Sequence, residues 1–165
     1  MRTQVLVLGT ALLACPAAAQ WNTATDYTGT SPRNTATVRN ENGAQVDLWL
    51  DEDARLHLVF SLPRGLVALA PDLCPTFQVD DRPSEDLSGP EHACSARGGE
   101  ATLTLAQARE QQVRSATLLE LMNGSSLTVR YRLEHAGYGA AEFTLKRSKQ
   151  ALYDVLGEGY EVGAD

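Results

Sequence analysis

The sequence predicts an α+β fold that is mainly antiparallel β, with a sandwich-like sheet and two short covering helices. Apolar and polar residues alternate in several short segments separated by turn residues, which is the pattern of antiparallel strands with one buried face. Near the C-terminal end the apolar spacing changes twice to that of a helix, at residues 118–122 and 149–156. These patterns together predict a sheet with helices packed on it.

Residues 1–19 have the composition of a secretory signal peptide. Arg2 is followed by an apolar run over residues 5–13 and then by three alanines that end at Ala19. The run is too short to span a bilayer, which takes about 20 residues, so cleavage after Ala19 and export to the periplasm or the medium are expected. The alternative is a lipid anchor at Cys15, because Leu-Leu-Ala-Cys resembles the lipobox of bacterial lipoproteins.

Beyond this leader the chain is long enough for one domain with its own core. Residues 20–34 are rich in Thr, Asn and Gly and are expected to form a polar N-terminal segment. A single β-rich domain is expected over residues 35–157. A flexible C-terminal tail is expected over residues 158–165.

The first part of the domain predicts a hairpin. Strands are expected at 35–39 and 46–50, and Asn42-Gly43 between them offers the positive φ angles of a tight turn. The acidic run at 51–53 is expected to be a solvated turn. A calcium loop would need ligands spaced over about 12 residues, with a central Gly and a closing Glu.

Alternation then predicts a strand at 56–62, a short one at 66–69, and another at 77–80. Residues 83–90 are expected to be a loop, because the Pro, Gly and Ser residues there disfavour regular structure. A further alternating strand is expected at 102–105.

The last part of the domain predicts two helices next to two strands. Ser115 is placed to cap the helix that contains residues 118–122, and Asn123-Gly124 offers a left-handed stop before a strand at 127–133.

After that strand, Gly137-Tyr138-Gly139 is expected to turn the chain into a strand at 141–145. Ser148 is then expected to cap a last helix, at 149–156, that ends at Gly157.

Cys74 and Cys94 are the two cysteines beyond the leader, and they are expected to form a disulfide. An even number of cysteines in an exported protein favours a disulfide over a catalytic thiol or a zinc site. Closing a loop of this size is expected to stabilise the fold by about 3 kcal/mol on the chain-entropy model.

The charge pattern argues against two classes of partner. The formal net charge is −7, and no stripe of Lys and Arg interrupts the acidic background. Binding to nucleic acid or to an anionic lipid surface is therefore disfavoured. No segment beyond the leader is apolar enough over enough residues to be a transmembrane helix.

No catalytic motif is present in the sequence. Of the three histidines, only His92 has a cysteine at metal spacing, and a cysteine in a disulfide does not bind a metal. No metal, no cofactor and no catalytic residue are therefore predicted. A Ser, His and Asp set that comes together only in space stays open, because triads are defined by geometry. His57 is its best candidate, and the alternative is that His57 is a solvated residue of a strand.

A possible binding surface is formed by Trp49, Arg130 and Arg132. Tryptophan and arginine are enriched at interaction hot spots, and Trp21 is a further aromatic residue of this kind. The alternatives are that Trp49 packs beneath another layer and that the arginines belong to a solvated basic face. That face would also include residues 146, 147 and 149.

The chain resembles the invasion-associated locus B family, whose members are small exported proteins of alphaproteobacteria and their relatives. The resemblance covers roughly residues 55–155. It lies in the exported cysteine pair and in the succession of these segments: Leu62-Pro63, Leu66-Val67, Phe77-Gln78-Val79-Asp80, Leu118-Leu119-Glu120-Leu121-Met122-Asn123-Gly124, Phe143-Thr144-Leu145-Lys146 and Ala151-Leu152. It implies an envelope protein, with a role in host-cell invasion for some pathogenic members, and it carries over no active site.

The sequence therefore predicts an exported, periplasmic envelope protein that acts by binding an envelope protein or a surface ligand. The alternative function is that of a small periplasmic hydrolase with a Ser/His/Asp site formed in space.

Overall fold

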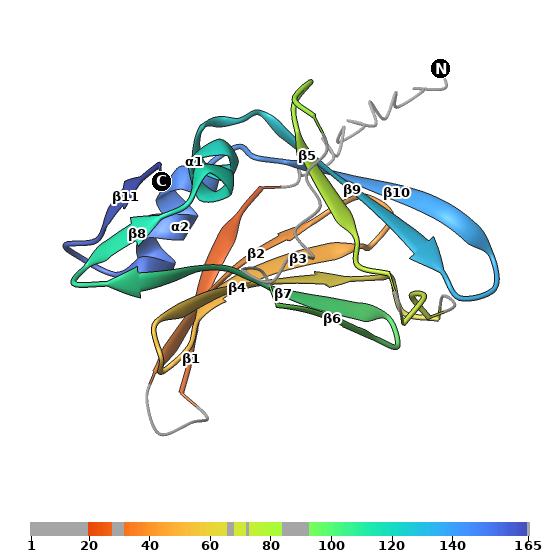
Figure 1. The fold of residues 1–165 in the computed structure, drawn as a ribbon, viewed down its shortest axis with the longest axis horizontal. Helices are drawn as coiled ribbons and strands as arrows, with labels where there is room; N and C mark the ends of the chain where they lie inside the picture. The colour runs from red at the N-terminus through yellow and green to blue at the C-terminus, as the bar shows by residue number, and fades with distance from the viewer. Residues whose placement is uncertain (1–19, 28–31, 66–67, 72, 84–92, 165) are drawn as a thin grey trace, which may run out of the picture.

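The computed structural model describes residues 20–27, 32–65, 68–71, 73–83 and 93–164 (Figure 1). The expected leader with Cys15, His92 and most of the expected loop at 83–90 lie outside the described residues. So does the first half of the strand expected at 66–69. In its second half, Leu69 forms an isolated antiparallel bridge with Leu133.

The described strands form two sheets, and nearly all neighbouring strands are antiparallel. The 8-stranded sheet runs in the order β1 (Asn22–Asp26), β2 (Arg33–Arg39), β3 (Gln45–Leu50), β4 (Arg55–Ser61), β7 (Glu100–Arg109), β8 (Gln112–Arg114) and β11 (Glu161–Gly163), with β6 (Cys94–Arg97) paired to β7 beside this path. The 3-stranded sheet runs in the order β10 (Gly137–Thr144), β9 (Ser126–Leu133) and β5 (Thr76–Val79). The one parallel pair among them is β8 with β11.

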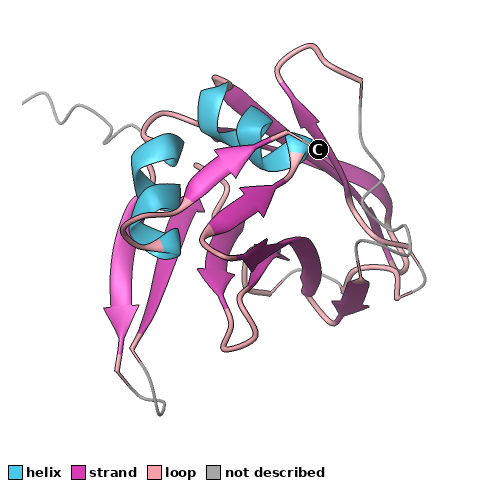
Figure 2. Cartoon of the chain, turned by 60° about the vertical axis from the view of Figure 1, so that its left-hand side comes forward, coloured by secondary structure: helices cyan, strands magenta, loops and turns pink. Residues whose placement is uncertain are grey.

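Helices α1 (Ala116–Asn123) and α2 (Ser148–Leu156) pack against each other on the large sheet. Helix α2 contacts β1, β2 and β3, whereas α1 contacts β7 and β11. The small sheet covers another part of the large sheet, so that helices and small sheet together close one core (Figure 1 and Figure 2). The predicted α+β class, mainly antiparallel with two short covering helices, is confirmed.

Phe60 of β4 marks the place where the two sheets meet. Its side chain is fully buried, and its ring centre lies 5.2 Å from that of Tyr131 on β9 and 6.3 Å from that of Phe143 on β10. These aromatic contacts join the inner faces of the two sheets, as in a sandwich. The other largest fully buried side chains are Leu48, Leu56, Leu58, Leu69, Leu103, Leu105, Leu118, Leu121, Leu127, Leu152 and Val38.

The helix ends agree with the sequence in one case and differ in two. Ser115 caps α1 as predicted, because its side chain accepts the N–H of Leu118. The left-handed stop at Gly124 is wrong, since the φ of Gly124 is −76°. Glycine is needed there for space instead: a Cβ atom would lie 2.3 Å from Cγ1 of Val79.

Ser148 does not cap α2, so that prediction is wrong. The N-cap is Arg147, which has a φ of 69° and no side-chain capping bond. Ser148 is buried between the helices and donates its hydroxyl hydrogen to the carbonyl oxygen of Leu121, at 2.6 Å. A buried hydroxyl needs a partner, and packing of the two helices supplies this one.

Strand β1 lies inside the expected polar N-terminal segment, and β11 lies inside the expected tail at 158–165. These strands are held by pairing with β2 and β8 rather than by an alternating apolar pattern. Trp21, just before β1, is buried and donates its indole N–H to the carbonyl oxygen of Thr144, at 2.9 Å. It therefore belongs to the core and not to an exposed hot spot.

Strand β10 begins earlier than expected. Residues 137–139 are its first residues and not a turn, and they pair with β9 in a continuous register. Gly139 has a packing reason, because a Cβ atom there would lie 2.7 Å from the ring of Tyr131 on the opposite strand. Two glycines around a tyrosine are typical of turns, which explains the wrong prediction.

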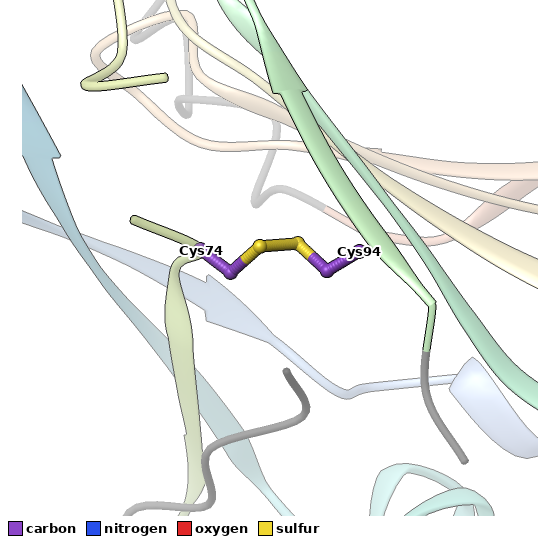
Figure 3. The surroundings of a disulfide bond; sticks show 2 residues. All are labelled: Cys74 and Cys94. Atoms are coloured by element: carbon purple, nitrogen blue, oxygen red, sulfur yellow. A yellow bond between two sulfur atoms is a disulfide. The ribbon is translucent and has the colours of Figure 1, made fainter. Parts of the chain in front are cut away.

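Cys74 and Cys94 form a disulfide across a sequence separation of 20 residues (Figure 3). Cys74 lies just before β5 of the small sheet, and Cys94 is the first residue of β6 in the large sheet. The bond therefore ties the two sheets to each other.

Candidate functional site

Trp49 lies on the outer face of the large sheet, opposite the buried side chains of β3. It is half-buried, because its ring stacks on His57 of β4 at 4.5 Å between ring centres and the guanidinium of Arg33 lies 4.6 Å from the indole centre. Strand β3 lies between β2 and β4. Trp49 is thus the middle of a row of side chains across three strands, and no other layer covers it among the described residues.

His57 is held by a carboxylate. Its Nε2 lies 2.8 Å from Oδ2 of Asp51, and the two side chains are 14% and 20% exposed. Asp51 also accepts the backbone N–H of Arg55 at 2.8 Å. The expected solvated turn at 51–53 is therefore wrong for Asp51, which packs back against β4, while the next two residues are exposed.

The pKa of Asp51 lies below its ordinary value. Partial burial opposes ionisation, but the hydrogen bond with His57 and the N–H of Arg55 outweigh it, as does the positive charge that His57 carries when protonated. Asp51 is therefore an ionised, hydrogen-bonded carboxylate in the folded protein.

Thr104 of β7 completes a line of three groups. Its Oγ1 lies 3.5 Å from Nδ1 of His57, so that a carboxylate, an imidazole and a hydroxyl stand in the order of a hydrolytic triad. The donors that stabilise a tetrahedral intermediate are backbone N–H groups or polar side chains; β4 and β7 are interior strands paired on both sides, so their backbone N–H groups are used within the sheet. Two cavities within the described residues, of about 590 and 160 Å³, are lined by other residues.

Replacing Asp51 by Asn is expected to lower the free energy of unfolding at pH 7 by about 1 kcal/mol, because a charge-assisted hydrogen bond is weakened. The folded pKa of Asp51 is depressed, so this contribution is fully present above the unfolded pKa of about 3.9 and is lost as the pH falls through the folded pKa. Urea unfolding at pH 7 and pH 3 should show the difference from wild type shrinking at the lower pH. Asp53→Asn is the control, since its carboxylate is 69% exposed and a surface ion pair contributes little; equal effects of both variants would contradict the assignment.

A second group of side chains lies on the outer face of the small sheet. Arg130 and Arg132 alternate along β9 with the inward side chains that meet the core. Nη1 of Arg130 donates to Oε1 of Gln78 at 2.6 Å. The guanidinium of Arg132 lies 5.8 Å from the ring centre of Tyr138, the residue opposite it on β10. Tyr138 is 81% exposed, the largest exposed fraction among the large hydrophobic side chains of the described residues.

The structure does not bring the predicted surface residues together. Trp49 lies on the outer face of one sheet and Arg130 and Arg132 on the outer face of the other, with the core between them. Residues 146, 147 and 149 follow β10 at the end where Thr144 pairs with Ser126, away from the two arginines. The expected basic face is therefore divided between two places.

Tyr138 is the surface residue that sequence reasoning missed. It was expected in a turn, yet it stands opposite Arg132 as the second residue of β10 in a regular strand pair. The signal that could have identified it is the alternation of residues 138, 140 and 142 with the buried Ala141 and Phe143. We call the outer face around Arg130, Arg132 and Tyr138 the arginine–tyrosine face.

In the part of the chain that the structure describes, no helix has the length and apolarity to cross a membrane. Within those same residues, no three His, Cys, Asp or Glu side chains are grouped as a metal site would require. The arginine–tyrosine face and the Trp49 row are two places in the described part of the chain where aromatic and charged side chains lie together.

Comparison with known proteins adds information on the fold. No protein-family profile matches the chain, and no curated protein matches its sequence. The structure is similar to the crystal structure of invasion associated protein B from Bartonella henselae, with a TM-score of 0.53 over 86% of this chain and 94% of that chain. The two sequences are 13% identical, a level at which the likeness concerns the fold alone. The resemblance expected from the sequence is therefore supported as a similarity of fold to invasion associated protein B.

Proposed function

We propose that this protein is exported to the periplasm or the medium and acts by binding an acidic partner protein of the envelope through the arginine–tyrosine face. The observation that carries the proposal is the exposed pair of Tyr138 and Arg132 beside Arg130 on one face of the small sheet. Tyrosine and arginine are enriched where proteins bind each other, and such interfaces centre on a few residues of this kind.

The chemistry of the face favours an acidic partner. A guanidinium presents several N–H donors in one plane and can donate two parallel hydrogen bonds to a single carboxylate. Arg132 is already oriented by the ring of Tyr138, so less side-chain freedom is lost when it binds. Glu142, further along β10, is the one acidic side chain that β9 and β10 add to this face.

Export is supported by two independent features. The leader has the composition of a signal peptide, and the Cys74–Cys94 disulfide belongs to an oxidising compartment. The fold shared with invasion associated protein B is consistent with a place in the envelope. The Cys15→Ser variant separates cleavage after Ala19 from a lipid anchor. A change in its membrane association relative to wild type would indicate the anchor, and no change would indicate cleavage after Ala19.

The binding proposal is tested by a photo-cross-linking amino acid placed at position 138 in intact cells. We expect discrete adducts with another protein, and we expect them to be lost when Arg130→Glu and Arg132→Glu are added, because reversed charges repel an acidic partner. The expected loss is about tenfold or more, the effect of one desolvated charge pair.

Two controls make this experiment decisive. The same cross-linker at Tyr27, which is 78% exposed elsewhere on the molecule, reports background capture. The double variant Arg39→Glu and Arg109→Glu carries the same charge change at exposed positions on other strands. Equal adducts from positions 27 and 138, or equal loss with both double variants, would overturn the proposal.

A small periplasmic hydrolase is the second candidate, and the line of Asp51, His57 and Thr104 is the observation that favours it. We place it behind binding because β4 and β7 are paired on both sides, which leaves their backbone N–H groups unavailable to an oxyanion. Turnover of a simple ester that disappears in Thr104→Val but persists in Thr102→Val would reverse this order.

A further inference from the structure

Strand β10 forms one edge of the small sheet. Within the described residues it pairs along its whole length with β9, and no strand occupies its other side. An edge strand presents a row of backbone N–H and C=O groups to which another strand can bind.

The hydrogen-bond pattern of the β9–β10 pair determines which backbone groups of β10 point outward. Leu145 donates its N–H to the carbonyl of Ser125, directly after the pair of Thr144 and Ser126. In an antiparallel pair the bonded and non-bonded positions alternate. Residues 143, 141, 139 and 137 therefore bond to β9, whereas Tyr138, Ala140, Glu142 and Thr144 direct their N–H and C=O groups away from it.

Trp21 gives an independent check of this pattern. Its indole N–H reaches the carbonyl oxygen of Thr144 from outside the small sheet, as the alternation requires. Trp21 thereby occupies the last outward carbonyl of β10. The outward groups of Tyr138, Ala140 and Glu142 form the remaining free edge.

This edge lacks the usual protection against pairing. Proteins block edge strands with proline, lysine, a bulge or a very short strand. β10 has eight residues, no proline, no lysine and a register without a shift, and Glu142 is its one charged residue. By comparison, β5 at the other edge of the small sheet has four residues, and a proline precedes it.

We propose that β10 pairs antiparallel with β10 of a second copy of this chain, around a two-fold axis at Ala140, so that the two small sheets become one six-stranded sheet. Ala140 is then opposite Ala140 of the second copy, and Tyr138 is opposite Glu142. Each strand supplies the same three outward residues, as a two-fold interface requires.

Charge complementarity favours a second copy as the occupant. Across the joined sheet, Arg132, Tyr138 and Glu142 of the second copy would stand in one row, because Arg132 is opposite Tyr138 on β9. Two strand spacings, about 10 Å between Cα atoms, separate Arg132 from that glutamate. An extended arginine lying over the tyrosine ring spans this distance, so each Glu142 gains a guanidinium from the other copy.

The small residue at the axis also fits the pairing. Ala140 is exposed and has Arg130 opposite it on β9. The two Arg130 side chains would stand three strand spacings apart, about 14 Å, where salt screens much of their repulsion. Pairing through one strand covers less surface than a stable dimer needs, so we expect a dimer whose fraction rises with protein concentration.

Cysteine cross-linking tests the register directly. Ala140→Cys is made in the full chain with Cys15→Ser, so that its thiol is the one outside the Cys74–Cys94 bond. Residues opposite each other in a bonded antiparallel pair have Cα atoms about 5.5 Å apart, which lies within the range of a disulfide. We expect mild oxidation to give a covalent dimer.

Ala136→Cys is the matched control. It is an exposed alanine of the same hairpin, but the two copies of position 136 would lie about 27 Å apart at opposite ends of the paired strands. We expect the covalent dimer to form from this position at about one tenth of the rate or below, because a distance of this size excludes a disulfide within the paired dimer. Similar rates from both positions, or none from position 140, would overturn the proposal.

Ala140→Lys gives a second measurement that does not depend on thiols. Two lysines facing each other at the axis should shift sedimentation equilibrium toward the monomer, since like charges directly opposite destabilise a strand pair. The far-ultraviolet circular dichroism spectrum checks that the variant is folded. A wild-type protein that stays monomeric at all concentrations contradicts the inference. Capture of a different protein by Ala140→Cys in cells also contradicts it, because the edge would then belong to another partner.

The inference does not rest on the proposed function, and the two can fail separately. A self-adduct in the photo-cross-linking experiment has twice the mass of the chain, whereas an envelope partner gives another mass. Pairing at the edge leaves the arginine–tyrosine face open to solvent, so both kinds of contact can exist in one molecule.

Discussion

Replacing Phe60 by Ala is expected to lower the free energy of unfolding by about 4 kcal/mol. Phe60 is fully buried and contacts Tyr131 and Phe143, the two rings of the small sheet that face it. Truncation therefore leaves a cavity at the junction of the two sheets, where strands from both sides would have to move to fill it. Urea unfolding followed by tryptophan fluorescence measures the loss, because Trp21 is buried in the same core.

Two controls separate the junction from strand β4 in general. Phe60→Leu keeps most of the apolar volume and should cost about 1.5 kcal/mol or less. Val59→Ala changes the adjacent residue, which points to the outer face, and should cost less than about 1 kcal/mol. A loss for Phe60→Ala no larger than that for Val59→Ala would show that the two sheets are not joined through this ring.

Removing the disulfide by the double change Cys74→Ala and Cys94→Ala is expected to cost about 3 kcal/mol, because the closed loop restricts the unfolded chain. The loss should also have a local part, since the bond ties the start of β5 to β6 in the other sheet. Urea midpoints of wild type and variant measure the global loss. Hydrogen exchange of the backbone N–H groups of β5 measures the local one.

The control for this variant is wild-type protein in a strong reductant. Its unfolding midpoint should fall to that of the double alanine variant, because both lack the same covalent bond. If reductant and mutation leave the midpoint unchanged, the bridge adds nothing to stability, and its role would have to be sought in the segment that it encloses.

The sequence predicts the strands whose two faces differ in polarity, and it misses those that are held by pairing alone. β3 and β4 have alternating apolar residues and were found close to their expected bounds. β1, β8 and β11 are short and polar, and they are held by backbone pairing with β2, with β7 and, for β11, with β8 far away in the chain. No local pattern records such a partner, so residues 20–34 and 158–165 could not be assigned from sequence alone.

The candidate site shows the same division. The outward direction of Arg130 and Arg132 followed from the alternation along β9. Their separation from Trp49 did not, because it depends on how the two sheets stack. The same holds for Asp51 and His57, whose hydrogen bond requires the turn after β3 to fold back on β4. Sequence gives the side of a strand on which a residue lies, whereas the packing of the sheets determines its neighbours.

The hydrogen bond from Trp21 to Thr144 has a consequence for the order of events during synthesis. It joins residues 123 positions apart, so the N-terminal strand has its anchor only after nearly the whole chain has been made. Contacts of such long range slow folding. Strands β1 to β4 can pair with one another earlier, but this end of the large sheet is fixed to the small sheet through Trp21 only when synthesis is nearly complete.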